Sequence, residues 1–186
     1  GGTFDPPHLA HLVFASIARY ELELDEVLFV PAGDPYRKVD HPVSPRESRL
    51  RMVEEAIAGL SWASVSTIEI DREGPTFTVQ TLEHLRSRGG EWWFLLGADA
   101  LADLPHWKDP AKIMELARLG LAQRSSVATI SEAVVEALPG IQERIDLIEM
   151  PLLGVSSTNL RQLVRDGRPT DFLLPKKVRV VIDELG

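Results

Sequence analysis

Cysteine is absent from the 186-residue sequence, which excludes disulfide bonds, thiolate metal sites and a cysteine nucleophile. The sequence also lacks an apolar run of about 18 residues, the length that a membrane-spanning helix needs. It shows no signal peptide. We therefore expect a cytoplasmic protein without a membrane partner.

The sequence has fewer positively charged than negatively charged residues. Asp and Glu number 28 against 20 Lys and Arg, and the formal net charge is −8. An acidic protein of this kind repels nucleic acid, so no nucleic-acid partner is expected. An anionic small molecule would need a local cluster of positive groups against this background.

Apolar runs typical of buried strands alternate with helical patterns along the chain. Strands are expected at 27–30, 62–70, 92–96, 119–123 and 145–150. Helices are expected at 8–23, 44–58, 76–88, 98–104, 109–120, 131–138, 156–165 and 175–185. Because the strands are continuous apolar runs, the pattern predicts an α/β fold with a parallel sheet covered by helices on both faces.

The stretch Gly1 to His11, GGTFDPPHLAH, carries the strongest local signal. Its two glycines permit a sharp turn close to a ligand, and Asp5 before two prolines is typical of a capped helix start. His8 and His11 lie three apart, on one face at the helix N-terminus, where anions are attracted. The stretch predicts a phosphate site, and a capped helix with two ordinary histidines is the alternative.

The opening glycines also raise a question about the start of the fold. A glycine turn that leads into a helix normally follows a strand, and nothing precedes Gly1 here. We therefore expect a first strand that the sequence does not include.

A second anion site is predicted where Ser156 or Ser157 caps a helix. The run Val155 to Arg161, VSSTNLR, combines hydroxyls and exposed amides with an arginine about one turn into the helix. A plain serine cap with a surface arginine is the alternative. Two anion sites at one sheet edge favour a polyphosphate ligand.

Ligands of parallel sheets bind outside the carboxyl ends of the strands. The loops at those ends are expected to converge on one crevice, and they comprise residues 1–8, 31–43, 97–107, 123–126 and 151–158. The proline-rich loop 31–43 is a candidate flap that closes on substrate.

Several segments together resemble the bacterial nicotinate-mononucleotide adenylyltransferases of the nucleotidyltransferase superfamily. Residues 1–11 resemble the signature Gly-Gly-Thr-Phe-Asp-Pro-x-His-x-Gly-His, and residues 155–161 resemble Ile-Ser-Ser-Thr-x-Ile-Arg. Residues 74–82, GPTFTVQTL, resemble Gly-Pro-Ser-Tyr-Thr-x-x-Thr-Leu. Residues 97–99 and Trp107 fall where the family places Gly-Ala-Asp and a tryptophan. The matches follow the family order along nearly the whole chain.

The resemblance implies a Rossmann-like, doubly wound single domain over 1–186, with a helical C-terminal part at about 156–186. It implies transfer of AMP from ATP to nicotinate mononucleotide, which gives deamido-NAD and pyrophosphate in NAD biosynthesis. The attacking phosphate is already ionised and needs no general base, in keeping with a sequence that offers no obvious nucleophile–base pair. Mg²⁺ is expected to arrive with ATP, without a metal site on the protein. The chain is expected to be a monomer or a homo-oligomer.

The resemblance also assigns residues to roles. The expected catalytic residues are His8, His11 and Arg161. The expected ATP-binding residues are Gly2, Thr3, Phe4, His8, His11, Asp99, Ser156, Ser157, Thr158 and Arg161. The residues expected to bind nicotinate mononucleotide are Lys38, Thr76, Phe77, Thr78, Trp107 and Arg124.

Two further interpretations concern the acceptor. The amides of residues 74–78 would receive the pyridine carboxylate, and Trp107 would stack on the pyridine ring. For Trp107 the alternative is simple packing against a loop, and for Asp99 it is a helix N-cap.

Four positions depart from the family pattern. Ala10 replaces glycine between the histidines, residues 35–38 replace Pro-Pro-His-Lys, Phe77 replaces tyrosine, and Arg124 lacks the proline-glycine that follows it elsewhere. The alternatives are another adenylyltransferase, for nicotinamide mononucleotide or phosphopantetheine, and a non-catalytic nucleotide-sensing module. A class I aminoacyl-tRNA synthetase fragment would share the histidine pair but not the Ser-Ser-Thr run.

Overall fold

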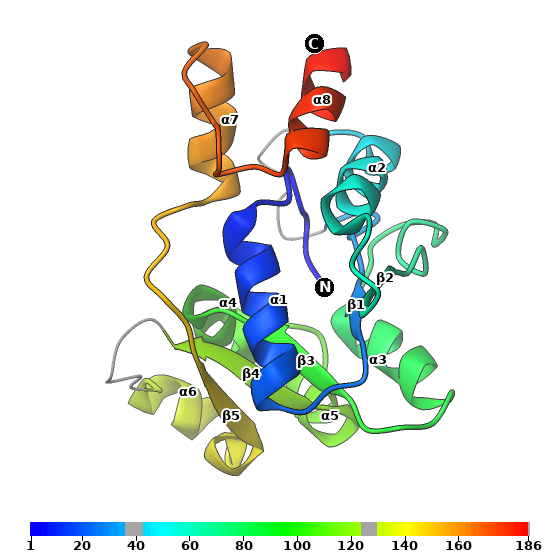
Figure 1. Ribbon diagram of the computed structural model, residues 1–186. Helices are drawn as coiled ribbons and strands as arrows, with labels where there is room; N and C mark the ends of the chain where they lie inside the picture. The colour runs from blue at the N-terminus through cyan, green and yellow to red at the C-terminus, as the bar shows by residue number, and fades with distance from the viewer. Residues whose placement is uncertain (36–42, 124–129, 186) are drawn as a thin grey trace. The chain divides into compact units, whose positions relative to one another are not determined.

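The computed structural model describes residues 1–35, 43–123 and 130–185 of the chain (Figure 1). These residues form two compact units. Unit 1 comprises residues 1–19, 23–76 and 153–186, and unit 2 comprises residues 20–22 and 77–152. The single domain expected over 1–186 stays a prediction.

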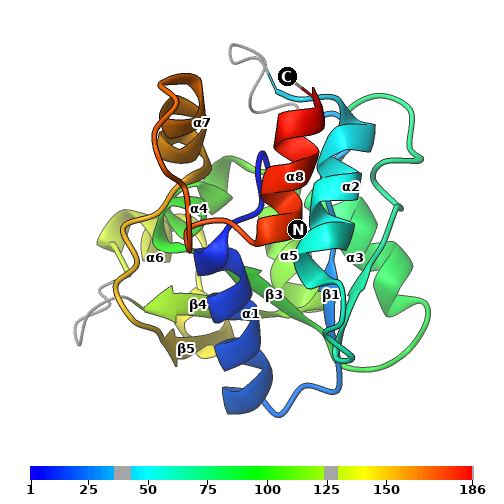
Figure 2. The ribbon, with the colours of Figure 1, turned by 45° about the horizontal axis from the view of Figure 1, so that its top comes forward.

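Unit 1 is built around a short parallel sheet. It contains nearly all of α1 (Leu9–Glu21), with β1 (Val27–Phe29), α2 (Arg46–Ile57), β2 (Ala63–Val65), α7 (Ser157–Arg165) and α8 (Lys176–Leu185). Strand β1 pairs with β2 in parallel, with Val27 opposite Ala63 and Phe29 opposite Val65. Helices α2 and α8 pack side by side (Figure 2).

The opening residues run beside the end of β1. The Gly2 amide donates to the Val30 carbonyl at 3.1 Å, and the Ala32 amide donates to the Gly2 carbonyl at 2.9 Å. These two bonds form a parallel bridge between Gly2 and Pro31. The residues that follow Gly2 are therefore placed at the carboxyl end of β1, the end at which parallel sheets bind ligands.

Unit 2 contains a three-stranded parallel sheet in the order β3-β4-β5. Its elements are α3 (Thr78–Arg86), β3 (Trp93–Leu96), α4 (Ala98–Asp103), α5 (Pro110–Leu116), β4 (Arg118–Gln123), α6 (Glu132–Ala137) and β5 (Ile145–Glu149). Short 3-10 turns lie at Leu104–His106 and Ile141–Arg144. The core of this unit includes the fully buried side chains Leu104, Ile113, Leu119 and Ile141.

Gly120 in the central strand β4 is closely covered by side chains. A Cβ there would lie 2.5 Å from the Leu95 Cδ2 atom and 3.0 Å from the Ile148 Cδ1 atom. Both of these side chains come from the neighbouring strands and pack over Gly120. A larger residue at this position would require the ends of these two side chains to shift.

The expected alternation of parallel strands and helices is confirmed, but some boundaries were wrong. The strand predicted at 62–70 ends at Val65. The Thr67 hydroxyl donates to Asp71 at 2.6 Å, and the Asp71 amide donates to the Thr67 carbonyl at 2.8 Å, which closes a turn. The helix predicted at 109–120 ends at Leu116 because β4 begins at Arg118.

Two predicted helix starts were also wrong. Helix α1 begins at Leu9 and Asp5 does not cap it. The helix predicted from residue 44 begins at Arg46, with Pro45 at the N-cap position of α2 and no side-chain capping bond. Asp5 and Ser44 are instead bonded to each other, as described below.

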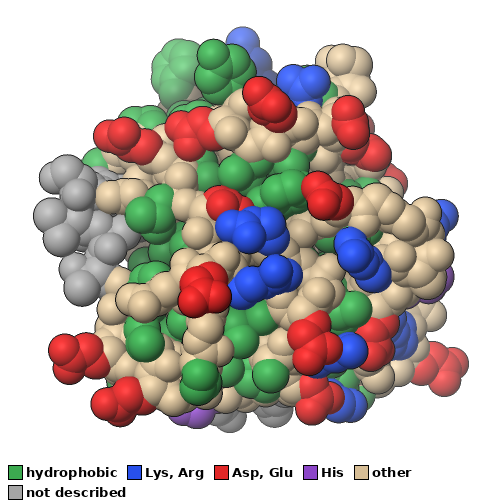
Figure 3. Space-filling view, turned by 90° about the horizontal axis from the view of Figure 1, so that it is seen from below, with side chains coloured by type: hydrophobic (Ala, Val, Ile, Leu, Met, Phe, Trp, Pro, Cys, Tyr) green, Lys and Arg blue, Asp and Glu red, His purple; other side chains and the backbone are tan. Residues whose placement is uncertain are grey.

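The surface mixes charges of both signs. On the face drawn in Figure 3, Lys and Arg side chains lie next to Asp and Glu side chains, with hydrophobic side chains between them. Such mixing differs from the basic stripe of a nucleic-acid-binding surface. In the described ranges, no helix has the length and apolar character needed to cross a membrane.

The charged cluster on the unit 2 sheet provides a test of the fold. Both oxygens of Asp146 accept bonds from Arg118, each at 2.7 Å, and the Trp93 indole N–H donates to the same carboxylate at 2.7 Å. The Arg118 guanidinium, followed by the indole, holds the pKa of Asp146 below its ordinary value of 3.8. The stabilisation is therefore present at neutral pH and is lost as the pH falls through the lowered pKa.

We expect Asp146→Asn to lower the free energy of unfolding by about 0.5–1 kcal/mol at pH 7, since the pair is partly exposed to solvent. Urea unfolding of both proteins at pH 7 and at successively lower pH measures this difference. The difference in the free energy of unfolding between the two proteins should become smaller once the wild-type carboxylate is protonated. A gap that does not change with pH would contradict the assignment of the stabilisation to this ion pair.

Candidate active site

The two histidines of the opening stretch are stacked on each other. Their ring centroids lie 3.7 Å apart with an interplanar angle of 24°. The Nδ1 atom of His11 accepts the backbone N–H of His8 at 3.1 Å. A neutral imidazole that accepts at Nδ1 carries its proton on Nε2. This bond therefore sets His11 in the tautomer that donates a hydrogen bond from Nε2.

The amides at the start of α1 are used differently from what the sequence suggested. The His8 amide is bonded to the His11 ring, and the Leu9 amide donates to the Leu173 carbonyl at 3.0 Å. These two amides were expected to face an anion, and they have internal partners instead. The prediction of an anion site in this stretch therefore depends on the imidazoles of His8 and His11.

Phe4 is the side chain that supports this pair. Its ring meets the His11 ring edge-on at a centroid distance of 5.1 Å and packs against Phe29 of β1 at 5.8 Å. Its backbone adopts φ 51°, a conformation that is uncommon outside glycine. The buried Phe4 ring therefore joins His11 to the sheet of unit 1.

The N-terminus of α7 lies against the same opening stretch within unit 1. The Ser156 hydroxyl accepts the Asn159 amide at 3.2 Å and caps the helix. The Ser157 hydroxyl donates to the Pro6 carbonyl at 2.9 Å. Ser156 is therefore the N-cap residue of α7. The bond from Ser157 to Pro6 joins two helix starts that are about 150 residues apart in the sequence.

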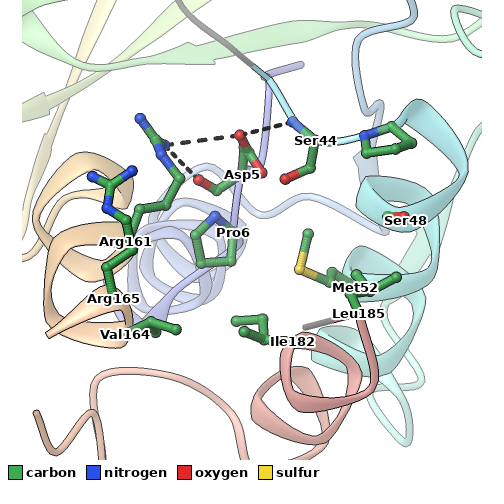
Figure 4. A pocket seen from close by; sticks show the side chains of 11 residues that line it. Asp5, Pro6, Ser44, Ser48, Met52, Arg161, Val164, Arg165, Ile182 and Leu185 are labelled. Carbon is green, nitrogen blue, oxygen red and sulfur yellow. Dashed lines mark hydrogen bonds and ion pairs between the residues drawn. The ribbon is translucent and has the colours of Figure 1, made fainter. Parts of the chain in front are cut away.

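Arg161 and Asp5 form the second link between these segments (Figure 4). The Arg161 Nη1 atom donates to the Asp5 carbonyl at 2.7 Å and lies 3.9 Å from its Oδ2 atom. The Arg161 Nη2 atom lies 3.5 Å from the Thr158 hydroxyl. Asp5 Oδ2 also accepts the Ser44 amide at 3.2 Å. A guanidinium and a hydroxyl are thus gathered at the N-terminus of α7, where an anion is favoured.

A cavity of about 400 Å³ opens beside this link in unit 1. Its polar wall includes Asp5, Arg161 and Arg165, and Figure 4 shows the Asp5 carboxylate between Arg161 and Ser44. Its lining also includes the apolar side chains Met52, Val164, Ile182 and Leu185.

Arg49 is the charged side chain that lies deepest in unit 1. It is 1% exposed. Its guanidinium donates to the carbonyls of Thr3 and Gly33 at 2.9 Å and of Ser44 at 3.0 Å. Burial lowers the pKa of Arg49, and the carboxylates of Asp5 and Asp34 oppose that shift.

The residues predicted to meet the acceptor are distributed over both units. Thr76 is buried in unit 1, and its amide donates to the Asp34 carbonyl at 3.3 Å, so this amide is not exposed as expected. Phe77 and Thr78 open α3 in unit 2, with no side-chain capping bond. The Lys108 ammonium lies 4.4 Å from the centroid of the Phe77 ring. A positive charge therefore stands beside the N-terminus of α3.

Trp107 and Asp99 also lie in unit 2. The Trp107 ring packs edge-on against Phe94 at 5.8 Å, and its indole N–H donates to Asp103 at 3.0 Å. The ring is only partly buried, so packing and ligand contact are both compatible with its position. Asp99 is exposed in the first turn of α4 and is not the N-cap, which is Gly97.

The structure brings together most of the predicted ATP-binding residues. Unit 1 holds Gly2, Thr3, Phe4, His8, His11, Ser156, Ser157, Thr158 and Arg161. Asp99 and the α3 start are in unit 2, so the convergence of all the strand-end loops stays a prediction. Lys38, Arg124 and most of the candidate flap 31–43 lie outside the described residues.

The described part of the chain contains no group of three or more His, Cys, Asp or Glu residues arranged to hold a metal ion.

Sequence reasoning missed the roles of Arg49, Ser44 and Lys108. Arg49 is an arginine within an ordinary amphipathic helix, and only its burial distinguishes it. Lys108 directly follows the predicted Trp107, and that proximity was the available signal. The bond between Asp5 and Ser44 joins positions 39 residues apart, which local pattern cannot reveal.

Comparison with known proteins identifies the family. The sequence model of the cytidylyltransferase-like family matches residues 1–163. A protein of Roseiflexus sp. (strain RS-1), named probable nicotinate-nucleotide adenylyltransferase, is 44% identical over 100% of this chain and 94% of its own length. A protein of Thermomicrobium roseum with the same name is 37% identical over 100% of this chain and 88% of its own length.

Solved structures support the fold. The nicotinic acid mononucleotide adenylyltransferase of Plasmodium falciparum complexed with NaAD superposes with a TM-score of 0.75 at 20% identity, over 98% of this chain and 93% of that one. At this identity the likeness shows the Rossmann-like fold alone. With the full-length sequence relatives, it leads to one conclusion: the chain belongs to the nicotinate-nucleotide adenylyltransferases of the cytidylyltransferase-like family.

Proposed function

We propose that this protein transfers the adenylyl group of ATP to nicotinate mononucleotide and releases pyrophosphate, with the ATP phosphates bound in unit 1. The observation that carries this site assignment is the link between two anion-binding helix starts. Ser157 and Arg161 of α7 donate to the backbone carbonyls of Pro6 and Asp5 at 2.9 and 2.7 Å. The imidazoles of α1 and the hydroxyls of α7 are thereby held in one unit.

The bond changes require little chemistry from the protein. An ionised oxygen of the nicotinate mononucleotide phosphate forms a bond to the α-phosphorus of ATP. The bond from that phosphorus to the bridging oxygen of the β-phosphate breaks, and pyrophosphate leaves. No proton has to be removed from the nucleophile, so rate enhancement comes from positioning and charge stabilisation.

His11 is suited to stabilise the charge that develops on the phosphates. Its Nδ1 atom accepts the His8 amide at 3.1 Å, so the neutral ring carries its proton on Nε2. His8 stacks on the His11 ring at 3.7 Å and restricts its rotation. A donor held in place in this way costs no reorganisation when charge moves to the leaving group.

The β- and γ-phosphates are assigned to the N-terminus of α7. The Arg161 guanidinium and the Thr158 hydroxyl lie together there, with a distance of 3.5 Å between Nη2 and Oγ1. Arg161 is about one third exposed, so its free donors can reach a ligand while Nη1 stays on Asp5. The Ser156 and Ser157 hydroxyls instead fix the helix start, and their backbone amides are the groups left to contact phosphate.

The acceptor is assigned to Lys38, Thr76, Phe77, Thr78, Trp107 and Arg124. At the start of α3, the helix dipole and the nearby Lys108 both favour a carboxylate over a neutral amide. This charge pattern favours the acid form of the pyridine nucleotide as the acceptor.

Mg²⁺ fits this scheme as a companion of ATP. Its preferred ligands are oxygens, and it commonly binds substrate phosphates with one or two carboxylates. When bound, it neutralises part of the triphosphate charge. The residues described above position the phosphates around it.

The activity itself is tested by offering the protein Mg-ATP with nicotinate mononucleotide, nicotinamide mononucleotide or phosphopantetheine. We expect pyrophosphate release with the nicotinate form and a higher kcat/KM for it than for the amide form. Coupled detection of pyrophosphate, with chromatography of the dinucleotide, measures both. Release only with phosphopantetheine would identify another adenylyltransferase, and ATP binding without turnover would indicate a sensing module.

The role of His11 is tested by His11→Asn, whose side-chain oxygen can still accept the His8 amide. We expect kcat to fall by about 10²–10³, the usual cost of removing one transition-state donor. His84 is exposed on α3, and His84→Asn is the matched control with unchanged kcat. Steady-state kinetics and thermal melting are measured for both variants. If the His11→Asn protein stays active but has a strongly lowered Tm, the role of His11 is structural and not catalytic.

A further inference from the structure

Arg49 connects three segments that are separate in the sequence. Its Nη1 atom donates to the Thr3 carbonyl in the opening stretch, and its Nη2 atom donates to the Gly33 carbonyl after β1, each at 2.9 Å. Its Nε atom donates to the Ser44 carbonyl, which precedes α2, at 3.0 Å. All three nitrogens of the guanidinium are therefore used on backbone.

A buried arginine at this place is costly unless its charge is compensated. The carboxylates of Asp5, Asp34, Glu47 and Glu69 face it and favour its charged form. The guanidinium presents its three donor nitrogens in one rigid plane, and each nitrogen bonds a different backbone carbonyl. A lysine ammonium is a compact charge that cannot span the same three acceptors in that geometry.

The segments that carry the Thr3 and Ser44 carbonyls are connected to the candidate phosphate site. Thr3 precedes Phe4, whose ring contacts His11 at 5.1 Å. The amide of Ser44 bonds Asp5 at 3.2 Å, and the Asp5 carbonyl holds Arg161 at 2.7 Å. A continuous path of hydrogen bonds thus leads from Arg49 through Ser44 and Asp5 to Arg161.

Gly33 adds a constraint on the same path. A Cβ at this position would collide with the Glu69 carbonyl, so the chain after β1 packs directly on the neighbouring backbone. The Arg49 guanidinium bonds the Gly33 carbonyl from within the unit. The backbone at Gly33 is therefore held both by the Arg49 hydrogen bond and by close packing.

We propose that Arg49 is a positioning residue for the adenylyl transfer: it holds the Thr3–Asp5 segment, and through it His11 and Arg161, in the geometry that the ATP phosphates require. This inference rests on the proposed function for its kinetic consequences. It does not require Arg49 to touch a substrate.

The kinetic test compares Arg49→Lys and Arg49→Met with the wild type. Arg51 lies on the same helix, is half exposed and pairs with Glu184, so Arg51→Met is the matched control. We expect kcat/KM for ATP to fall about 10- to 100-fold in Arg49→Lys, since two charge-assisted hydrogen bonds are lost. Arg51→Met should stay within twofold of the wild type. An Arg49→Lys protein with kcat/KM within twofold of the wild type per folded molecule overturns the proposal.

Amide hydrogen exchange provides a readout that does not depend on activity. The Ala32 amide reports the bridge to Gly2, and the Ser44 amide reports the bond to Asp5. We expect both to exchange about 10-fold faster in Arg49→Lys, with a smaller change at Leu121 in β4 of unit 2. Equal acceleration at all three amides would mean a loss of global stability and would contradict a local positioning role.

The two readouts also separate this inference from the proposed function. A wild-type protein that makes no dinucleotide refutes the proposed function, and the exchange rates then decide alone whether Arg49 holds the segment. An active wild type with unaltered exchange and kinetics in Arg49→Lys refutes the positioning role alone.

Discussion

Two hydrogen bonds between α7 and the opening segment are the interaction on which the site in unit 1 depends. The donors, Ser157 and Arg161, lie on a helix near the end of the chain, and the acceptors are the Pro6 and Asp5 carbonyls near its beginning. Each bond alone contributes modestly to stability. Their importance lies in geometry, because they set the N-terminus of one helix against the residues that lead into another. In the proposed site, the triphosphate meets the histidine side chains on one side and the N-terminus of α7 on the other.

The same site shows how polar groups are divided between structure and function. The Ser156 hydroxyl caps α7, the His11 Nδ1 atom binds the His8 amide, and one Arg161 nitrogen stays on Asp5. Each of these side chains uses a polar atom to fix the local backbone. The buried Arg49 extends this arrangement inward, since it satisfies carbonyls that would otherwise be left unbonded in the interior.

The sequence predicted the parallel α/β architecture and most element positions, because buried parallel strands are recognisable as continuous apolar runs. It was wrong at some boundaries. Thr67 and Asp71 close a turn inside the predicted strand 62–70, and α2 begins at Arg46 after Pro45 and not at residue 44. The motif residues around His11 and Arg161 were predictable from local spacing and family resemblance. The contacts of Arg49, Asp5 and Ser44 were not, since they join segments up to 46 residues apart through backbone carbonyls and an amide, which carry no sequence signature.

The proposed binding of the ATP phosphates in unit 1, between His8, His11 and the start of α7, can be observed in a crystal structure of the protein with Mg²⁺ and a non-hydrolysable ATP analogue. We expect phosphate oxygens within hydrogen-bonding distance of His11 Nε2, the Thr158 hydroxyl and the Arg161 guanidinium. Arg49 should still be bonded to the Thr3 carbonyl. Phosphates bound away from both helix starts, with His11 and Arg161 making no contact to the nucleotide, would contradict the proposed binding.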